Sequence, residues 1–172
     1  MARTLKSVGF TGVYHINRLR EGQDTSVNTE QKEQSIPAAQ SEDLEIYYCI
    51  EPIGPEHNYE ELLVEIKRAR DLKISVTAVM RRTPVAGTPL AEEGQITAME
   101  LTKMAAVTNI VVNPLRSMNV HEPSQMSLLA GVNQLYAELG ANPRDNKSKT
   151  EKSRGFTPKK AWEMLWEAGY TM

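Results

Sequence analysis

Cysteine is nearly absent from this chain, whose 172 residues include only Cys49. A lone cysteine excludes an internal disulfide and a cage of cysteine thiolates around a metal ion. An iron–sulfur cluster is held by about three or four thiolates, so these residues cannot hold one by themselves. We expect Cys49 to be a core residue on a strand.

Long apolar runs and an excess of charge are missing as well. No apolar run reaches the roughly 18 residues of a membrane-spanning helix, and the first residues lack the apolar core of a secretion signal. The net charge of −2 gives no electrostatic footprint for nucleic acid. The 40% of hydrophobic residues is enough for a core. We therefore expect a single cytoplasmic domain over 1–172, with neither nucleic acid nor a membrane as partner.

Five short apolar runs recur along the chain, each bounded by turn residues. The first three are rich in Val, Ile and Tyr, which favours β-strands. Their continuous apolar character is typical of a buried parallel sheet. The five predicted strands are 12–16, 44–50, 74–80, 117–120 and 134–139.

Helix start signals lie between and after these runs. In a capping box, the side chain of a small polar residue accepts a hydrogen bond from the backbone N–H three residues later, and a Glu at that later position bonds back to the first residue. The last predicted helix carries two tryptophans four residues apart, which we expect to pack rather than to form a binding platform. The predicted caps are Asn58 with Glu61, Thr97 with Glu100, Ser124, and Thr157 with Pro158 after it; the two tryptophans are Trp162 and Trp166.

Three segments are predicted from other signals. Residues 2–8 have the pattern of the end of a helix that stops at Gly9. Residues 28–40 occupy the position of a helix, but the segment is polar and Pro37 should break or kink it. Residues 146–156 are largely charged and polar, which predicts an exposed loop.

The alternation of strands and helices predicts parallel pairing through right-handed crossovers. Two architectures fit this pattern, an open doubly wound sheet and part of a (β/α)8 barrel. The density of βα units matches a barrel of about 250 residues. We therefore predict an α/β fold, a partial (β/α) TIM-type barrel with about five parallel strands and flanking helices.

The unusual polar side chains cluster after the strands, where barrels carry their chemistry. All three histidines, His15, His57 and His121, lie at or after strand ends, so a histidine metal site is one alternative, although no two of them are closely spaced. The arginines near these ends suit a bidentate bond to a ligand carboxylate, and they suit equally an ion pair with a neighbouring glutamate. Those arginines are Arg18, Arg20, Arg81 and Arg82.

Four stretches carry a family resemblance. They are residues 13–22 (VYHINRLREG), 50–56 (IEPIGPE), 83–91 (TPVAGTPLA) and 130–133 (AGVN). In this order they resemble the C-terminal half of radical S-adenosylmethionine enzymes of the biotin synthase type, a group that includes biotin synthase, a hydrogenase maturase and methylornithine synthase. The resemblance covers about residues 2–170.

The resemblance implies roles for individual residues. S-adenosylmethionine would be the cofactor, a [4Fe–4S] cluster would reduce it, and the deoxyadenosyl radical would abstract a hydrogen from a small, amino-acid-like substrate. The implied cofactor-binding residues are Arg18, Arg20, Glu21, Glu51, Ile53, Gly54, Val85, Gly87 and Leu90. The implied substrate-binding residues are His15, Asn17, Arg116, His121, Glu122 and Glu138.

The cluster sets this chain apart from the family. The family's CxxxCxxC motif and first three strands precede the part that the chain resembles, so a cluster would have to be supplied by an N-terminal half. The expectation is thus the binding half of a truncated or split enzyme, joined by that missing half or by a second copy of itself. The alternatives are a non-catalytic binding or partner protein derived from this fold, and a metal-dependent barrel enzyme that uses the histidines.

Overall fold

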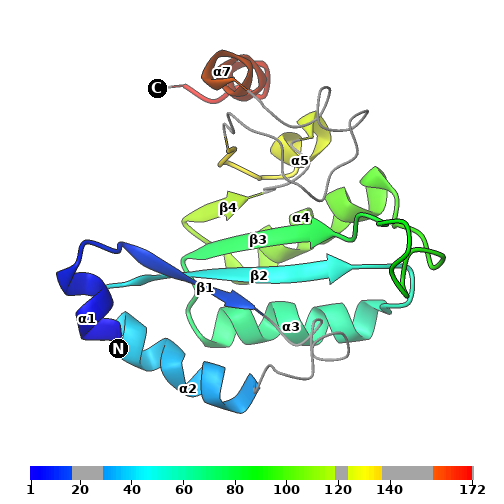
Figure 1. Ribbon diagram of the computed structural model, residues 1–172. Coiled ribbons are helices and arrows are strands. Elements are labelled where there is room, and N and C mark those ends of the chain that lie inside the picture. Colours follow the sequence, from blue (N-terminus) through cyan, green and yellow to red (C-terminus); the bar gives the residue numbers. More distant parts are fainter. Residues whose placement is uncertain (17–28, 119–123, 137–156, 172) are drawn as a thin grey trace.

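The structure is a computed structural model that describes residues 1–16, 29–118, 124–136 and 157–171 (Figure 1). Helices and strands alternate along most of the chain, as the sequence predicts. The strands are β1 (Gly12–Ile16), β2 (Glu45–Ile53), β3 (Val76–Arg81) and β4 (Arg116–Met118). The helices are α1 (Ala2–Ser7), α2 (Thr29–Gln40), α3 (Tyr59–Asp71), α4 (Ala98–Val112), α5 (Gln125–Leu129) and α7 (Pro158–Glu167).

The strands of the described residues form one sheet in the order β1-β2-β3-β4, and every pair is parallel. The first four predicted strands are therefore confirmed. Of the fifth, the described residues show a parallel bridge from Gln134 to Met118, which places this segment beside β4. The result is an α/β fold with a four-stranded parallel sheet flanked by helices.

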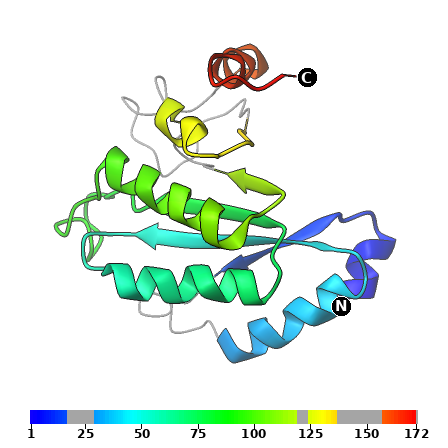
Figure 2. The same ribbon diagram turned by 180° about the vertical axis from the view of Figure 1, so that it is seen from behind.

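One face of the sheet is covered by helices, and we call it the helix face. Figure 2 shows α3 and α4 side by side in front of the strands. Alternate side chains of β2, Ile46, Tyr48 and Ile50, pack there in one core with Leu62 of α3 and Leu101 of α4. Because successive side chains of a strand point to opposite faces, the residues between them belong to the other side.

That other side, the opposite face, has a second apolar cluster. Cys49 of β2, Ala78 and Met80 of β3 and Met118 of β4 are all buried in it. The prediction that Cys49 is a core residue is confirmed, since only 2% of its surface is exposed. The sheet thus carries apolar layers on both faces, as the continuous apolar strands predict.

The predicted helix caps are all present. Asn58 and Thr97 each accept from the backbone N–H three residues on, and the glutamate there accepts from the cap residue in return. The hydroxyl oxygens of Ser124 and Thr157 accept from the backbone N–H three residues on and so cap α5 and α7, without a returning glutamate. A cap of this kind contributes about 1 kcal/mol, which helps to fix where each helix begins.

Two expectations about helices are wrong. The helix expected at 28–40 is present as α2, but Pro37 does not break it, because α2 runs through the proline from residue 29 to 40. Burial explains the difference, because Ile36 and Ala39 beside the proline are 2% and 6% exposed in the core. The tryptophans of α7 are not packed inside, since Trp162 is 45% and Trp166 is 71% exposed.

The helix predicted at the N-terminus is α1, and Gly9 follows it with a φ of 93°. The predicted loop at 146–156 lies outside the described residues. Within the part of the chain that the structure describes, none of the helices has the length and apolar character needed to cross a lipid bilayer.

Candidate functional site

The carboxyl ends of β2 and β3 form the candidate site. Glu51 lies near the end of β2, directly after Ile50, where the register between β2 and β3 begins to shift. It is only 8% exposed. Burial of a carboxylate is costly and therefore uncommon. The carboxyl ends of parallel strands are where α/β proteins bind their ligands, so a buried carboxylate at such an end is a candidate ligand-binding group.

The backbone after Glu51 departs from a regular strand. The Glu51–Pro52 peptide bond is cis, and the register between β2 and β3 shifts between Ile50 and Ile53. Ile53 is buried in the helix-face core, and Gly54 is buried directly after it. Ile53 therefore remains in the core although the register shifts just before it.

The turn at 54–57 is held by Arg82, the residue that follows β3. Both terminal nitrogens of Arg82 donate to the two carboxylate oxygens of Glu56, and the Nη2–Oε2 distance is 2.9 Å. The Arg82 side chain is 8% exposed and that of Glu56 is 33% exposed. Burial alone would raise the pKa of Glu56, but the hydrogen bonds from Arg82, a backbone hydrogen bond at Glu56 and the charge of Arg82 together outweigh it and hold the pKa below its ordinary value. Arg82 is thus committed to an internal carboxylate.

Gly54 is the residue that permits this approach. A Cβ at position 54 would overlap the Arg82 guanidinium and the Glu56 carboxylate. The Gly54 N–H donates to Nδ1 of His57 over 3.0 Å. A glycine is needed here for close approach rather than for an unusual backbone angle.

The loop between β3 and α4 contains the predicted adenine contacts. Val85 and Gly87 are exposed, Leu90 is partly exposed, and Gly87 adopts a φ of 84° in a turn. The end of this loop returns to β3, where Arg81 Nη1 donates to the Ile96 carbonyl over 2.6 Å. The structure therefore brings Glu51, the 54–57 turn and the base of this loop to the same edge of the sheet.

A row of tyrosines crosses the opposite face toward the amino ends of the strands. The rings of Tyr14 and Tyr47, which are register partners on β1 and β2, lie 5.0 Å apart. The hydroxyl of Tyr14 is 2.8 Å from that of Tyr136, which lies beyond β4 in the chain. The row therefore connects β1 with the far side of the sheet, and sequence reasoning missed it because a strand tyrosine has no signal of its own.

Two residues predicted to contact substrate lie elsewhere. His15 stacks on Tyr48 with ring centroids 4.9 Å apart, and Tyr48 belongs to the helix-face core. Its side chain therefore lies on the helix face of the sheet. Arg116 is the first residue of β4 and pairs with Glu45, the first residue of β2, so it lies at the amino ends of the strands.

The remaining predicted contacts lie outside the described residues. They are Arg18, Arg20, Glu21, Asn17, His121, Glu122 and Glu138. Among the residues that are described, no three histidine, cysteine or acidic side chains are grouped to hold a metal ion.

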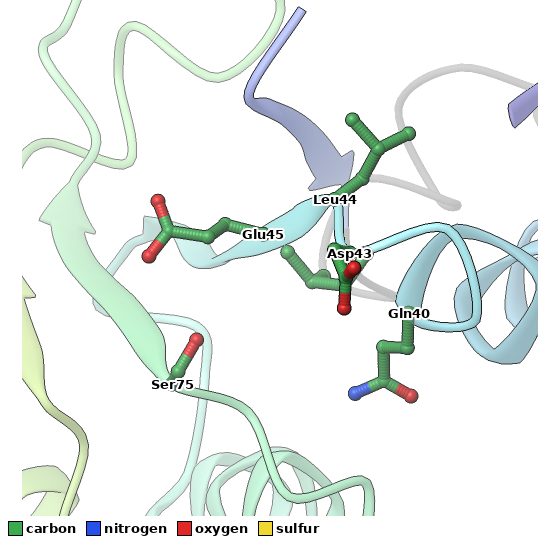
Figure 3. A pocket seen from close by; sticks show the side chains of 6 residues that line it. Gln40, Asp43, Leu44, Glu45 and Ser75 are labelled. Atoms are coloured by element: carbon green, nitrogen blue, oxygen red, sulfur yellow. The ribbon is translucent and has the colours of Figure 1, made fainter. Parts of the chain in front are cut away.

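A pocket of about 230 Å³ lies at the amino ends of the strands, the end of the sheet away from Glu51 (Figure 3). Its lining comes from the end of α2, the start of β2 and the residue before β3: Gln40, Asp43, Leu44, Glu45, Ile46 and Ser75. Sites for small organic ligands usually enclose about 300–1,000 Å³. This pocket is smaller, and it lies at the amino ends of the strands, where parallel α/β folds seldom bind their substrates. We therefore keep the carboxyl edge as the candidate site.

Comparison with known proteins identifies no family for this chain. No protein-family description and no curated protein matches the chain.

Proposed function

We propose that this chain is the S-adenosylmethionine- and substrate-binding part of a radical S-adenosylmethionine enzyme that acts on a small, amino-acid-like molecule. The observation that carries the proposal is the buried carboxylate of Glu51 at the carboxyl edge of the parallel sheet. It stands in the stretch 50–56, which is among those that resemble the family.

The chemistry of the edge suits this ligand. S-adenosylmethionine carries an ammonium and a sulfonium group, and a carboxylate in a poorly solvated place attracts such cations more strongly than one in water. We assign Glu51 to the methionine and ribose side and the Ile53–Gly54 backbone to the same region. The loop at 85–90 is assigned to adenine, and Arg18, Arg20 and Glu21 to the methionine carboxylate and amine.

A [4Fe–4S] cluster does not fit the residues of this chain. Cys49 is the single cysteine, and it is buried in the middle of β2. The cluster ligands would come from another polypeptide segment, which in the complete barrel would also pair with the edges of this sheet. What this chain contributes is the binding and orientation of the small molecules, through the groups named above.

Binding of S-adenosylmethionine to the purified chain tests the proposal. Equilibrium dialysis with labelled S-adenosylmethionine should show saturable binding, and Glu51→Gln should weaken it about tenfold or more, since a hydrogen bond to a charged group contributes about 1.5–3 kcal/mol. Glu45→Gln is the matched control, because it makes the same change at the other end of β2. Equal losses in both variants, or no saturable binding by the parent, would contradict the proposal.

Co-expression separates the enzyme from a binding protein of the same fold. A complex with the cluster-bearing half of a related enzyme should cleave S-adenosylmethionine to 5′-deoxyadenosine under reducing conditions. A complex that contains its cluster and binds S-adenosylmethionine without cleaving it would favour the non-catalytic alternative.

A further inference from the structure

Two segments of the chain meet at one side chain, that of Arg82. We propose that Arg82 is a positioning residue that fixes the 54–57 turn and the 83–96 loop relative to each other, so that the two segments bind one ligand together. The inference rests on the proposed function for the identity of that ligand.

On the β2 side, Arg82 is bonded through both its backbone and its guanidinium. Its N–H donates to the Ile53 carbonyl over 2.8 Å, and its terminal nitrogens donate to Glu56. Gly54 lies so close to the guanidinium that no side chain fits between them. The Ile53–Glu56 backbone therefore has little freedom to move while Arg82 keeps its place.

On the loop side, the same guanidinium reaches the far end of the loop. Nε and Nη2 of Arg82 donate to the Gly94 carbonyl over 3.3 and 3.2 Å. The preceding arginine, Arg81, donates to Ile96 over 2.6 Å. The loop begins directly after Arg82 and returns to it, so its two ends are close together, as in the compact loops that frequently carry function.

The loop also has internal order between these ends. Both the N–H and the hydroxyl of Thr88 donate to the Val85 carbonyl, over 3.1 and 2.8 Å, and Ala91 N–H donates to the Thr88 carbonyl over 3.0 Å. A loop that is ordered inside and anchored at its base moves as a unit about its anchor. The anchor that it shares with the 54–57 turn is Arg82.

This arrangement has a consequence for affinity. A ligand that contacts both segments binds tightly only if the two are already held in the right relation, because otherwise binding must order them. A ligand that contacts only the Glu51 region does not depend on the loop. Arg82 should therefore matter more for S-adenosylmethionine, whose adenine the proposed function assigns to the loop, than for free methionine, which reaches only the Glu51 and Ile53–Gly54 side.

The test is the variant Arg82→Lys in the full chain. Lysine keeps the charge but lacks the planar set of donors that reaches Glu56 and Gly94 at once. Arg70→Lys is the matched control, because Arg70 is half exposed and pairs with its neighbour Asp71 at the end of α3. Equilibrium dialysis measures labelled S-adenosylmethionine and labelled methionine separately, and hydrogen–deuterium exchange follows the 54–57 and 83–96 segments without any ligand.

We expect Arg82→Lys to weaken binding of S-adenosylmethionine about tenfold, to leave methionine binding within about twofold, and to speed exchange in both segments together. Arg70→Lys should change none of these. Equal loss for both ligands would indicate a general structural defect and overturn the proposal, as would faster exchange in only one segment.

The two proposals fail in different ways. If the parent binds S-adenosylmethionine and Arg82→Lys binds it equally well, the positioning role is wrong and the proposed function stands. If the parent does not bind S-adenosylmethionine at all, the proposed function is wrong and the ligand role of Arg82 falls with it.

Discussion

Gly54→Ala is the substitution whose effect follows most directly from the geometry. The added Cβ would occupy the space of the Arg82 guanidinium and the Glu56 carboxylate, so the ion pair must open or the turn must shift. Breaking a buried ion pair costs about 3–5 kcal/mol. Because the Glu56 side chain is 33% exposed and can turn to water, we expect a loss of about 2–3 kcal/mol in the free energy of unfolding. For a chain of this size that is a fall in Tm of about 4–12 °C.

Urea denaturation followed by circular dichroism measures this loss. Gly87→Ala is the control, because nothing lies within 4 Å of its Cβ and only its φ of +84° is unfavourable; about 1–2 kcal/mol is expected there. A double-mutant cycle gives the mechanism. In an Arg82→Ala background the guanidinium is gone and the Glu56 carboxylate is no longer held against position 54, so Gly54→Ala should cost less than about 1 kcal/mol. An equal cost with and without Arg82 would refute the reasoning.

Four other results are expected from single features of the structure. The purified chain, reconstituted with iron and sulfide, should show no visible [4Fe–4S] absorption from the monomer, because Cys49 is its only cysteine; a stoichiometric cluster signal would contradict this. Partial burial, and after it the hydrogen bond with Tyr136, raise the pKa of Tyr14, so the contribution of Tyr14 to stability is present below the ordinary tyrosine pKa of about 10 and is lost as the pH rises above that value. In a spectrophotometric titration, Tyr136→Phe should lower the pH at which Tyr14 ionises, and an unchanged titration would contradict the hydrogen bond. Acrylamide should quench the fluorescence of both exposed tryptophans of α7, whereas a shielded emission would place this helix differently. Pro37→Ala should raise the free energy of unfolding by about 1–3 kcal/mol, since α2 continues through a residue with no N–H to donate; a destabilised variant would show that the proline is required.

The fold was largely predictable from the sequence because its signals are local. The capping pairs at Asn58 and Thr97 mark where α3 and α4 begin, and they do so whatever the rest of the chain does. The apolar strands indicate burial on both faces. Because these signals are local, they fail at α2. The proline predicts a break in the helix, whereas the burial of Ile36 and Ala39 in the core, which depends on the rest of the fold, explains why the helix continues.

The site was less predictable because it depends on which face and which end of a strand a residue occupies. His15 is near a strand end, as a substrate-binding residue of a barrel would be, yet its position in β1 places its ring against Tyr48 on the helix face. The family resemblance alone assigns Arg116 to the substrate, since the predicted strand 117–120 already begins after it, and the structure has it as the first residue of β4. The pair formed by Arg82 and Glu56 is separated by 26 positions in the chain, and nothing in the spacing indicates that the two meet.

The central claim is that the carboxyl edge of the sheet binds S-adenosylmethionine, and photolabelling tests it most directly. An azidoadenine analogue of S-adenosylmethionine is irradiated with the full chain, and mass spectrometry locates the adduct. The account predicts labelling in the peptides that contain Gly54 or the 85–90 loop, suppressed by excess S-adenosylmethionine. Labelling confined to the pocket around Asp43 and Glu45 at the amino edge, or no labelling that S-adenosylmethionine suppresses, would contradict it.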